Sequence, residues 1–349
     1  NAGGGGVNRN VIINGAMNVA QRGTSSTGLG ATDGYYTCDR WHLDFASTAG
    51  RLTMTQDSSA PVGFANSLKL DCTTADTSIA SGEQTTLQHR IEGQNLQMFA
   101  KGTSSAKPYA LSFYVKGNAS ATYVAELFDL DNTRVVSKSF SVTTDWARVE
   151  LSFPTDTTGA FDDDNALSLM LNIWLHAGSN YTSGTLGTTW ASKTDANRAV
   201  GISSFFDSTD RTFFITGVQL EVGQNPTSFE HEPIERTLSK CQRYYNRHQS
   251  NTAYDVVTHG HFSSDTVWIG TYFFPTEMRA EPTLAGSDTW RIYTGSTVPV
   301  TSGSLTLTRA TTTAMTIEVQ TGDNNDIGQG AMMTNNNDSD AHIEFKAEL

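Results

Sequence analysis

The sequence predicts a mainly β protein: a jelly-roll β-sandwich, then a short connecting helix and a second, smaller C-terminal β domain. Three observations lead to this prediction. Between residues 25 and 229, short segments rich in Thr, Val, Tyr and Phe alternate apolar and polar residues, with clusters of Gly, Asn, Asp and Ser between them. One segment with helical periodicity follows. Strand-like segments then return as far as residue 347.

The first β-rich part contains several segments whose alternation places apolar side chains on one face of a strand. They are residues 51–56, 67–72, 109–116, 123–128 and 147–153. Residues 167–176 are almost continuously apolar, which predicts a central strand covered on both sides. Residues 211–221 alternate again. We therefore expect antiparallel hairpins arranged as a jelly roll.

Residues 234–248 predict the one clear helix. Pro233 precedes it, acidic residues lie near its start and basic residues near its end, as the helix dipole favours. Apolar residues recur at spacings of four, three and four and form one stripe: Ile234, Leu238, Cys241 and Tyr245. We expect this helix to dock on a neighbouring element and Cys241 to be a packing residue.

These patterns divide the chain into four parts. Residues 1–25 form a Gly-rich lead-in, residues 26–229 the jelly roll, residues 230–250 the connecting helix, and residues 251–349 the second β domain. Strands of this last domain are predicted at residues 266–274, 304–309, 315–320 and 342–347.

The composition excludes several classes of protein. Of 349 residues, 23 are Lys or Arg and 36 are Asp or Glu, and the net charge of −13 argues against binding nucleic acid through its phosphates. No run approaches the roughly 20 apolar residues of a membrane-spanning helix, so we expect no membrane insertion. Cys38, Cys72 and Cys241 form no CxxC pair, and we expect them to be buried.

Several ordered segments resemble those of tail-fibre and fibre-like appendage proteins of tailed bacteriophages that carry a carbohydrate-binding-module-like jelly roll. The first opens the chain, with NVIINGAM at residues 10–17, QRGTS at 21–25 and YTCDRW at 36–41. The others are FITGVQLEVG and PTSFE at 214–230, KCQRYY at 240–245, and FPTEMRAEPT at 274–283 with FKAEL at 345–349. Cys38 stands where the family has Ala, and the opening lacks the usual aromatic residue. Their fixed order is more specific than any one segment.

The resemblance implies a virion protein, located on the tail or fibre appendage and therefore extracellular. It implies attachment to other virion tail proteins through the N-terminal segment, a homo-oligomer that is most often a trimer, and β domains that recognise the host. The partner would be a glycan or protein of the host cell surface.

Two groups of residues suggest metal ions. Asp162 and Asp164 lie in an acidic loop whose oxygens suit a structural calcium ion, although a solvated loop is the commoner explanation of such a run. His259 and His261 are two residues apart and share a face of a strand. In a trimer, three such pairs around an axis would offer six nitrogens to a transition metal, whereas most pairs of this kind are surface residues. The sequence requires no cofactor.

Aromatic residues in polar surroundings are the candidate ligand contacts, because exposed aromatic rings mark recognition sites. They are Tyr181 and Trp190 in the first domain and Trp290 and Tyr293 in the second. Trp174 lies in the most apolar strand, and we expect it to pack in a core.

No catalytic motif is present: the sequence has no nucleophile elbow, no HExxH and no phosphate-binding glycine loop. Glu230 and Glu232 resemble a glycosidase carboxylate pair, but their position at a helix start explains their charge. We therefore expect a non-enzymatic tail fibre that binds a host receptor. The alternatives are a glycan depolymerase of the same appendage type and a purely structural capsid or tail decoration protein.

Overall fold

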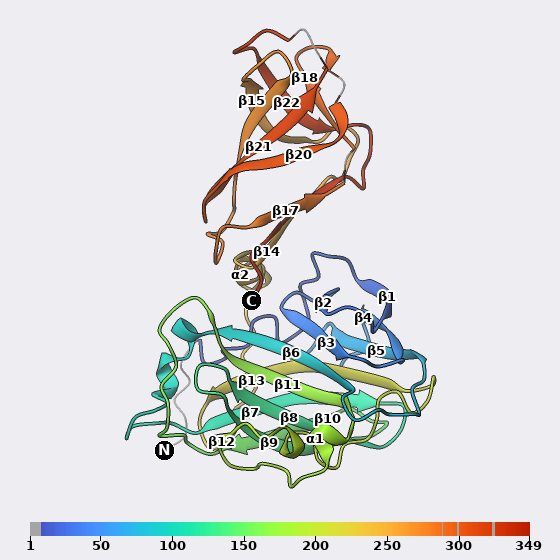
Figure 1. Cartoon of the computed structure of the whole chain (residues 1–349), viewed down its shortest axis with the longest axis vertical. Coiled ribbons are helices and arrows are strands. Elements are labelled where there is room, and N and C mark those ends of the chain that lie inside the picture. Colours follow the sequence, from blue (N-terminus) through green and yellow to red (C-terminus); the bar gives the residue numbers. More distant parts are fainter. Residues whose placement is uncertain (1–7, 288, 299, 323–324) are drawn as a thin grey trace. The chain divides into compact units, whose positions relative to one another are not determined.

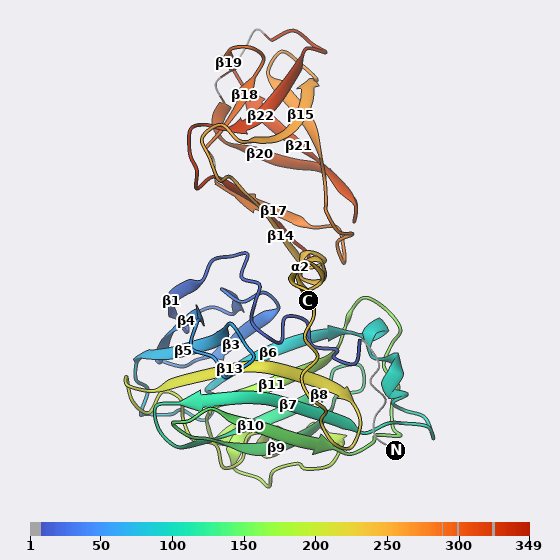
Figure 2. The same cartoon turned by 180° about the vertical axis from the view of Figure 1, so that it is seen from behind.

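The computed structural model describes residues 8–287, 289–298, 300–322 and 325–349, and its chain divides into two compact units (Figures 1 and 2). The first unit extends to Thr237 and includes Leu349, and the second is Leu238–Glu348. Each unit has its own antiparallel sheets and its own apolar core. The predicted mainly β fold, with a sandwich followed by a helix and a smaller β domain, is confirmed.

The first unit is a sandwich of two antiparallel sheets. Sheet A has the order β1 (Ser25–Leu29), β4 (Arg51–Asp57), β5 (Ser67–Thr74), β13 (Thr212–Val222), β7 (Tyr109–Gly117) and β10 (Ala147–Phe153). Sheet B has the order β12 (Ala191–Ser192), β9 (Arg134–Val142), β8 (Ala121–Asp129), β11 (Leu167–Ala177), β6 (Gln84–Glu92), β3 (Trp41–Ala46) and β2 (Gly34–Tyr35). All the strands predicted in this part are present.

The main core lies between sheets A and B. Alternate residues of sheet A, such as Leu68 and Phe113, meet alternate residues of sheet B, such as Leu127 and Leu171, and all four are fully buried. The strand β11 lies between β8 and β6 in the middle of sheet B. This position confirms the central strand that its apolar sequence predicts, because the face opposite the core is also covered.

The long connection between β11 and β13, which contains α1 (Ser179–Thr182) and η3 (Asp195–Asn197), covers part of that opposite face. The turns η1 (Gly93–Asn95) and η2 (Gln97–Phe99) follow β6, and Phe99 packs in the main core. Trp174 of β11 is 1% exposed and packs in a small cluster with Val124, Ala199 and the half-buried Tyr181. The prediction that Trp174 packs in a core is therefore confirmed, in this smaller cluster.

The described part of the lead-in, residues 8–24, contains no strand and lies along β13. The backbone N–H of Val11 donates to the carbonyl of Leu220 at 3.0 Å, and the side chain of Asn10 donates to the carbonyl of Val218 at 3.0 Å. Residues 1–7 of the predicted lead-in lie outside the described residues.

The second unit contains two further antiparallel sheets. Sheet C has the order β14 (Tyr245–Gln249), β23 (His342–Lys346) and β17 (Thr283–Gly286). Sheet D has the order β19 (Thr297–Val298), β18 (Trp290–Tyr293), β22 (Gly330–Asn335), β15 (Val256–Phe262), β16 (Val267–Phe273), β21 (Ala314–Thr321) and β20 (Val300–Ala310). Their shared core includes Trp268, Ile317 and Phe345.

The helix α2 (Ile234–Gln242) is shorter than the sequence predicts. The extension to residue 248 is wrong, because Tyr245 begins β14 and pairs with Lys346 of β23. The boundary between the units falls within α2, after Thr237, and β14 belongs to the second unit. Cys38, Cys72 and Cys241 are in no disulfide among the described residues, and all three are buried, as expected. Within the described ranges, no helix has both the length and the apolar character needed to cross a bilayer.

Candidate functional site

The outer face of sheet D carries a groove of about 520 Å³. Its side chains come from β15, β16, β21 and β20, which are consecutive neighbours in the sheet. The lining residues are Thr258, His259, Gly260, His261, Ile269, Gly270, Thr271, Phe273, Arg309 and Thr316.

Strand alternation explains why these side chains point away from the core. In β16, Trp268 is fully buried, whereas Phe273 is 75% exposed. In β15, His259 and His261 are exposed, and Phe262 is buried. The strand and the shared exposed face that the sequence predicts for the two histidines are therefore present.

Two glycines form the floor of the groove, and they leave space for a tryptophan beneath it. Gly260 and Gly270 are directly paired between β15 and β16. A Cβ atom at Gly260 would lie 2.6 Å from the indole of Trp268, and one at Gly270 would lie 2.3 Å from it. The indole is held from below, because its Nε1 donates to the carbonyl of Ala331 at 3.3 Å. Any larger residue at either position would therefore disturb the floor.

The groove combines polar groups with apolar surface. His259, His261 and Arg309 provide ring and guanidinium nitrogens, and Thr271 and Thr316 provide hydroxyl groups. Ile269 and Phe273 provide apolar surface beside them. Among the described residues that line the groove, none is Asp or Glu. Such a site suits a ligand with many hydroxyl groups and one apolar face, and it favours neutral or anionic ligands over cations.

The predicted contacts Trp290 and Tyr293 lie in β18, on opposite faces of sheet D. Tyr293 is half-buried and pairs with Met332, which in turn pairs with His259, so all three occupy one row of the sheet. The Arg291 guanidinium lies over the Tyr293 ring, 4.9 Å from its centre. Trp290 is 3% exposed and belongs to the core. We therefore assign Trp290 to packing, a correction to the expected ligand contact.

Tyr181 and Trp190 lie in the first unit, and both are partly packed. Tyr181 contacts Trp174, with a distance of 5.2 Å between the ring centres. The indole Nε1–H of Trp190 donates a hydrogen bond to the carbonyl of Pro154 at 2.9 Å. Pro154 is also one of the residues that line an open hollow of about 710 Å³ in the first unit. Neither lines the groove on sheet D, and their ligand contacts stay predictions.

Neither predicted metal site is part of a larger cluster of His, Cys, Asp and Glu side chains among the described residues. Asp162 and Asp164 are exposed, and Asp164 accepts a hydrogen bond from the backbone N–H of Ala166 at 2.9 Å. Neither this pair nor His259 with His261 belongs to a group of three described His, Cys, Asp or Glu side chains with ligand atoms within 4.8 Å. Calcium at the aspartates and an axial metal at the histidines stay predictions.

Sequence reasoning missed Phe273 and Arg309 as site residues. Both residues lie in segments that are predicted as strands. If Trp268 faces the core, alternation along the strand places Phe273 on the opposite, outer face. The sequence does not give the order of the strands in sheet D, which places β20 two strands from β16 and so brings Arg309 to the groove.

No family model matches the chain, and no curated protein sequence matches it. Solved structures with similar folds include carbohydrate-binding modules. One, described as CBM4, has 10% identity and a TM-score of 0.33, and covers 61% of this chain and 99% of its own. A family 11 module from Clostridium thermocellum, in complex with a mixed-linked tetrasaccharide, has 12% identity and a TM-score of 0.28, with coverages of 60% and 98%.

Another similar structure is the enzymatically active domain of tailspike protein 4 from bacteriophage CBA120. Its identity is 14% and its TM-score 0.29, and the match covers 53% of this chain and 19% of that chain. At TM-scores of this size, the fold assignment rests on the sheets and cores of the chain itself.

Proposed function

We propose that this chain is a non-enzymatic tail fibre or fibre-like appendage of a tailed bacteriophage, which recognises a glycan on the host cell surface. The observation that supports recognition most directly is the groove on sheet D, with its exposed Phe273 beside the nitrogens of His259, His261 and Arg309. The virion assignment is supported by the ordered sequence segments that resemble those of phage fibres.

The groove matches the chemistry of a sugar ring. A sugar presents hydroxyl groups at its edge and C–H groups on its faces. The imidazoles, the Arg309 guanidinium and the threonine hydroxyls hydrogen-bond the edge, and Phe273 packs against a face. In a trimer, three such grooves would act together, and weak binding at each one gains strength through the raised effective concentration of the others.

We propose binding without cleavage, because the candidate glycosidase carboxylates are engaged elsewhere. Glu230 accepts hydrogen bonds from the backbone N–H groups of Asn8, Arg9 and Asn10 at 2.6, 2.8 and 3.3 Å. Burial acts to raise the pKa of Glu230, but these donors outweigh it and hold the pKa below its usual range. A carboxylate with a lowered pKa is a poor general acid.

The test is binding to purified bacterial surface polysaccharides and to intact cells. We expect wild-type protein to bind and Phe273→Ala and Arg309→Gln to lose at least tenfold in affinity. Ile327→Ala is the matched control, since Ile327 is 74% exposed in the same unit and lies outside the groove. Binding only to protease-sensitive receptors, or no binding to any cell, would overturn glycan recognition and favour a protein receptor or a decoration protein.

Two further measurements separate the remaining alternatives. Light scattering is expected to give the mass of a trimer, and a monomer would count against the fibre. A reducing-end assay on any polysaccharide that binds is expected to show no release of new ends. Release that Glu230→Gln abolishes would instead identify a depolymerase.

A further inference from the structure

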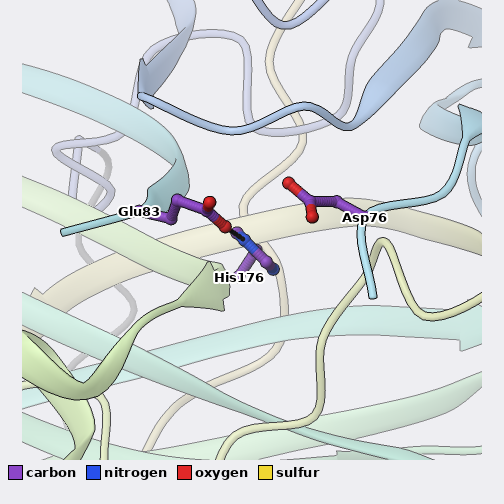
Figure 3. A group of neighbouring side chains, drawn as sticks. All are labelled: Asp76, Glu83 and His176. Atoms are coloured by element: carbon purple, nitrogen blue, oxygen red, sulfur yellow. Dashed lines mark hydrogen bonds and ion pairs between the residues drawn. The ribbon is translucent and has the colours of Figure 1, made fainter. Parts of the chain in front are cut away.

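Three side chains that are commonly metal ligands meet at one end of the first sandwich (Figure 3). Asp76 follows the end of β5 in sheet A, Glu83 directly precedes β6, and His176 lies near the end of β11 in sheet B. Their ligand atoms all lie within 4.8 Å of one another. The three residues are 5%, 6% and 0% exposed, so the cluster is shielded from water.

The imidazole of His176 is oriented by hydrogen bonds at both nitrogens. Its Nδ1 lies 2.8 Å from Ser204 Oγ, and its Nε2 lies 3.1 Å from Glu83 Oε2. Ser204 is itself fixed, since its Oγ accepts the backbone N–H of Phe206 at 3.1 Å. In Figure 3 the carboxylate of Asp76 points towards the imidazole from the other side. A second partner that fixes the ring in this way is typical of metal-binding histidines.

The carboxylate of Asp76 is positioned by two hydrogen bonds. Its Oδ2 accepts the hydroxyl of Thr48 at 3.0 Å and the backbone N–H of Ala49 at 2.7 Å. These two hydrogen bonds fix the Asp76 carboxylate beside the imidazole.

The charges in this cluster are incompletely balanced. Among the ion pairs of the described residues, neither Asp76 nor Glu83 contacts a Lys or Arg, and His176 is the one ion-pair partner of Glu83. Two carboxylates that are buried without a cation of their own are costly. A bound cation would remove this cost.

An independent observation is a buried hydroxyl group without a partner. Thr85 is fully buried, and its Oγ1 makes no hydrogen bond. Thr85 is aligned with His176 in the pairing of β6 with β11, next to a shift of register between Trp174 and His176. An unsatisfied buried oxygen beside the cluster calls for a further ligand or donor.

We propose that Asp76, Glu83 and His176 bind one divalent transition-metal ion, with Zn²⁺ as the representative ion and Thr85 as an additional oxygen donor. Zinc accepts nitrogen and carboxylate ligands at about 2.0–2.2 Å. The three ligand atoms lie within 4.8 Å of one another, so side-chain movement without a change of fold brings them onto one ion. His176 coordinates through Nε2, and its ring proton lies on Nδ1 and is donated to Ser204. The imidazole nitrogen favours a transition metal over calcium, which prefers oxygen.

The ion would be structural. It joins the connection between β5 and β6 to β11, and thus links sheet A to sheet B at this end of the sandwich. Since the unfolded chain does not assemble the ligands, bound Zn²⁺ raises the free energy of unfolding in proportion to the logarithm of its concentration.

Isothermal titration of chelator-treated full-length protein with Zn²⁺ tests the proposal. We expect one Zn²⁺ per chain, a rise in melting temperature on binding, and a visible absorption band when Co²⁺ replaces Zn²⁺. Glu83→Gln and His176→Gln are expected to abolish binding, and Ser204→Ala to weaken it about 10- to 100-fold. The double variant His259→Gln/His261→Gln is the control, and it should bind like wild type.

Absence of saturable Zn²⁺ binding to the wild-type chain would overturn the site. So would loss of binding in the His259/His261 control, or Ca²⁺ binding that Zn²⁺ does not displace. If His176→Gln fails to fold by circular dichroism, Asp76→Asn provides the same test, because its amide keeps the shape and one acceptor oxygen.

Discussion

Arg198 and Glu126 form a buried, two-pronged ion pair on the outer face of sheet B. The Nε of Arg198 donates to Glu126 Oε2 at 2.8 Å, and its Nη2 donates to Oε1 at 2.7 Å. Asn172 donates to the same Oε1 at 2.8 Å, and the guanidinium lies 4.8 Å from the centre of the Trp174 ring. Glu126 is fully buried. The long connection that carries Arg198 is thus anchored to β8 and β11 by charge as well as by packing.

We predict that Arg198→Met destabilises the first unit by about 3–5 kcal/mol, because it leaves the Glu126 carboxylate buried without a cation. Urea unfolding measures the change. The control is Lys69→Met, which removes a half-exposed pair with Asp71 and should cost less than about 1 kcal/mol. Equal effects of the two substitutions would contradict the role of the buried pair.

The second prediction concerns acid. Burial, together with the positive charges of the neighbouring Arg90 and Arg40, lowers the pKa of His42 to about 3. In the unfolded chain His42 therefore binds a proton below about pH 6.5, whereas in the folded chain it binds one only near pH 3. The free energy of unfolding consequently falls as the pH drops from about 6.5 to about 3. In this window, His42→Gln should reduce the slope of the unfolding free energy against pH by the equivalent of up to one bound proton. The control, His261→Gln, should keep the wild-type slope. If His42→Gln also keeps the wild-type slope, the explanation is wrong.

The third prediction concerns the groove floor. Gly260→Ala places a methyl group 2.0 Å from the carbonyl oxygen of Ile269 and 2.6 Å from Trp268, so we expect about 1–3 kcal/mol of destabilisation in the second unit. Gly330→Ala is the matched control, because Gly330 pairs with His261 in sheet D and its added Cβ meets nothing within 4 Å. Calorimetry that resolves the two units measures both, and comparable losses would refute the explanation.

The fourth prediction concerns the N-terminal segment. Glu230→Gln removes charged acceptors from the N–H groups of Asn8, Arg9 and Asn10, so these amides should exchange their hydrogens at least tenfold faster. Global stability should change by less than about 1 kcal/mol, since the three hydrogen bonds are exposed or only partly buried. Glu232→Gln serves as the control, and in this variant the amides of Asn8, Arg9 and Asn10 should exchange at the wild-type rate.

The strands were predictable because alternation is a local property, and a half-buried strand shows it in any context. The residue at which α2 ends could not be predicted in this way. The apolar stripe continues to Tyr245, but Tyr245 is in a strand because it pairs with Lys346 of β23. Distant pairing overrides a local helical period.

The candidate sites divide in the same way. His259 and His261 could be placed on one face, since they are neighbours in one strand. Phe273 and Arg309 join them only through the order of strands in sheet D. Asp76, Glu83 and His176 share no motif, because the two sheets of the sandwich bring them together.

The position of β23 has a consequence for biosynthesis. This strand, His342–Lys346, is the central strand of sheet C and is hydrogen-bonded to β14 on one side and β17 on the other. Without it, β14 and β17 have no partner in this sheet. On the ribosome, the sandwich has all its strands once β13 has emerged, whereas β14 must wait for β23. The first unit can thus fold while the second is still being translated, and a truncation before His342 should leave a folded sandwich followed by a second unit whose sheet C lacks its central strand.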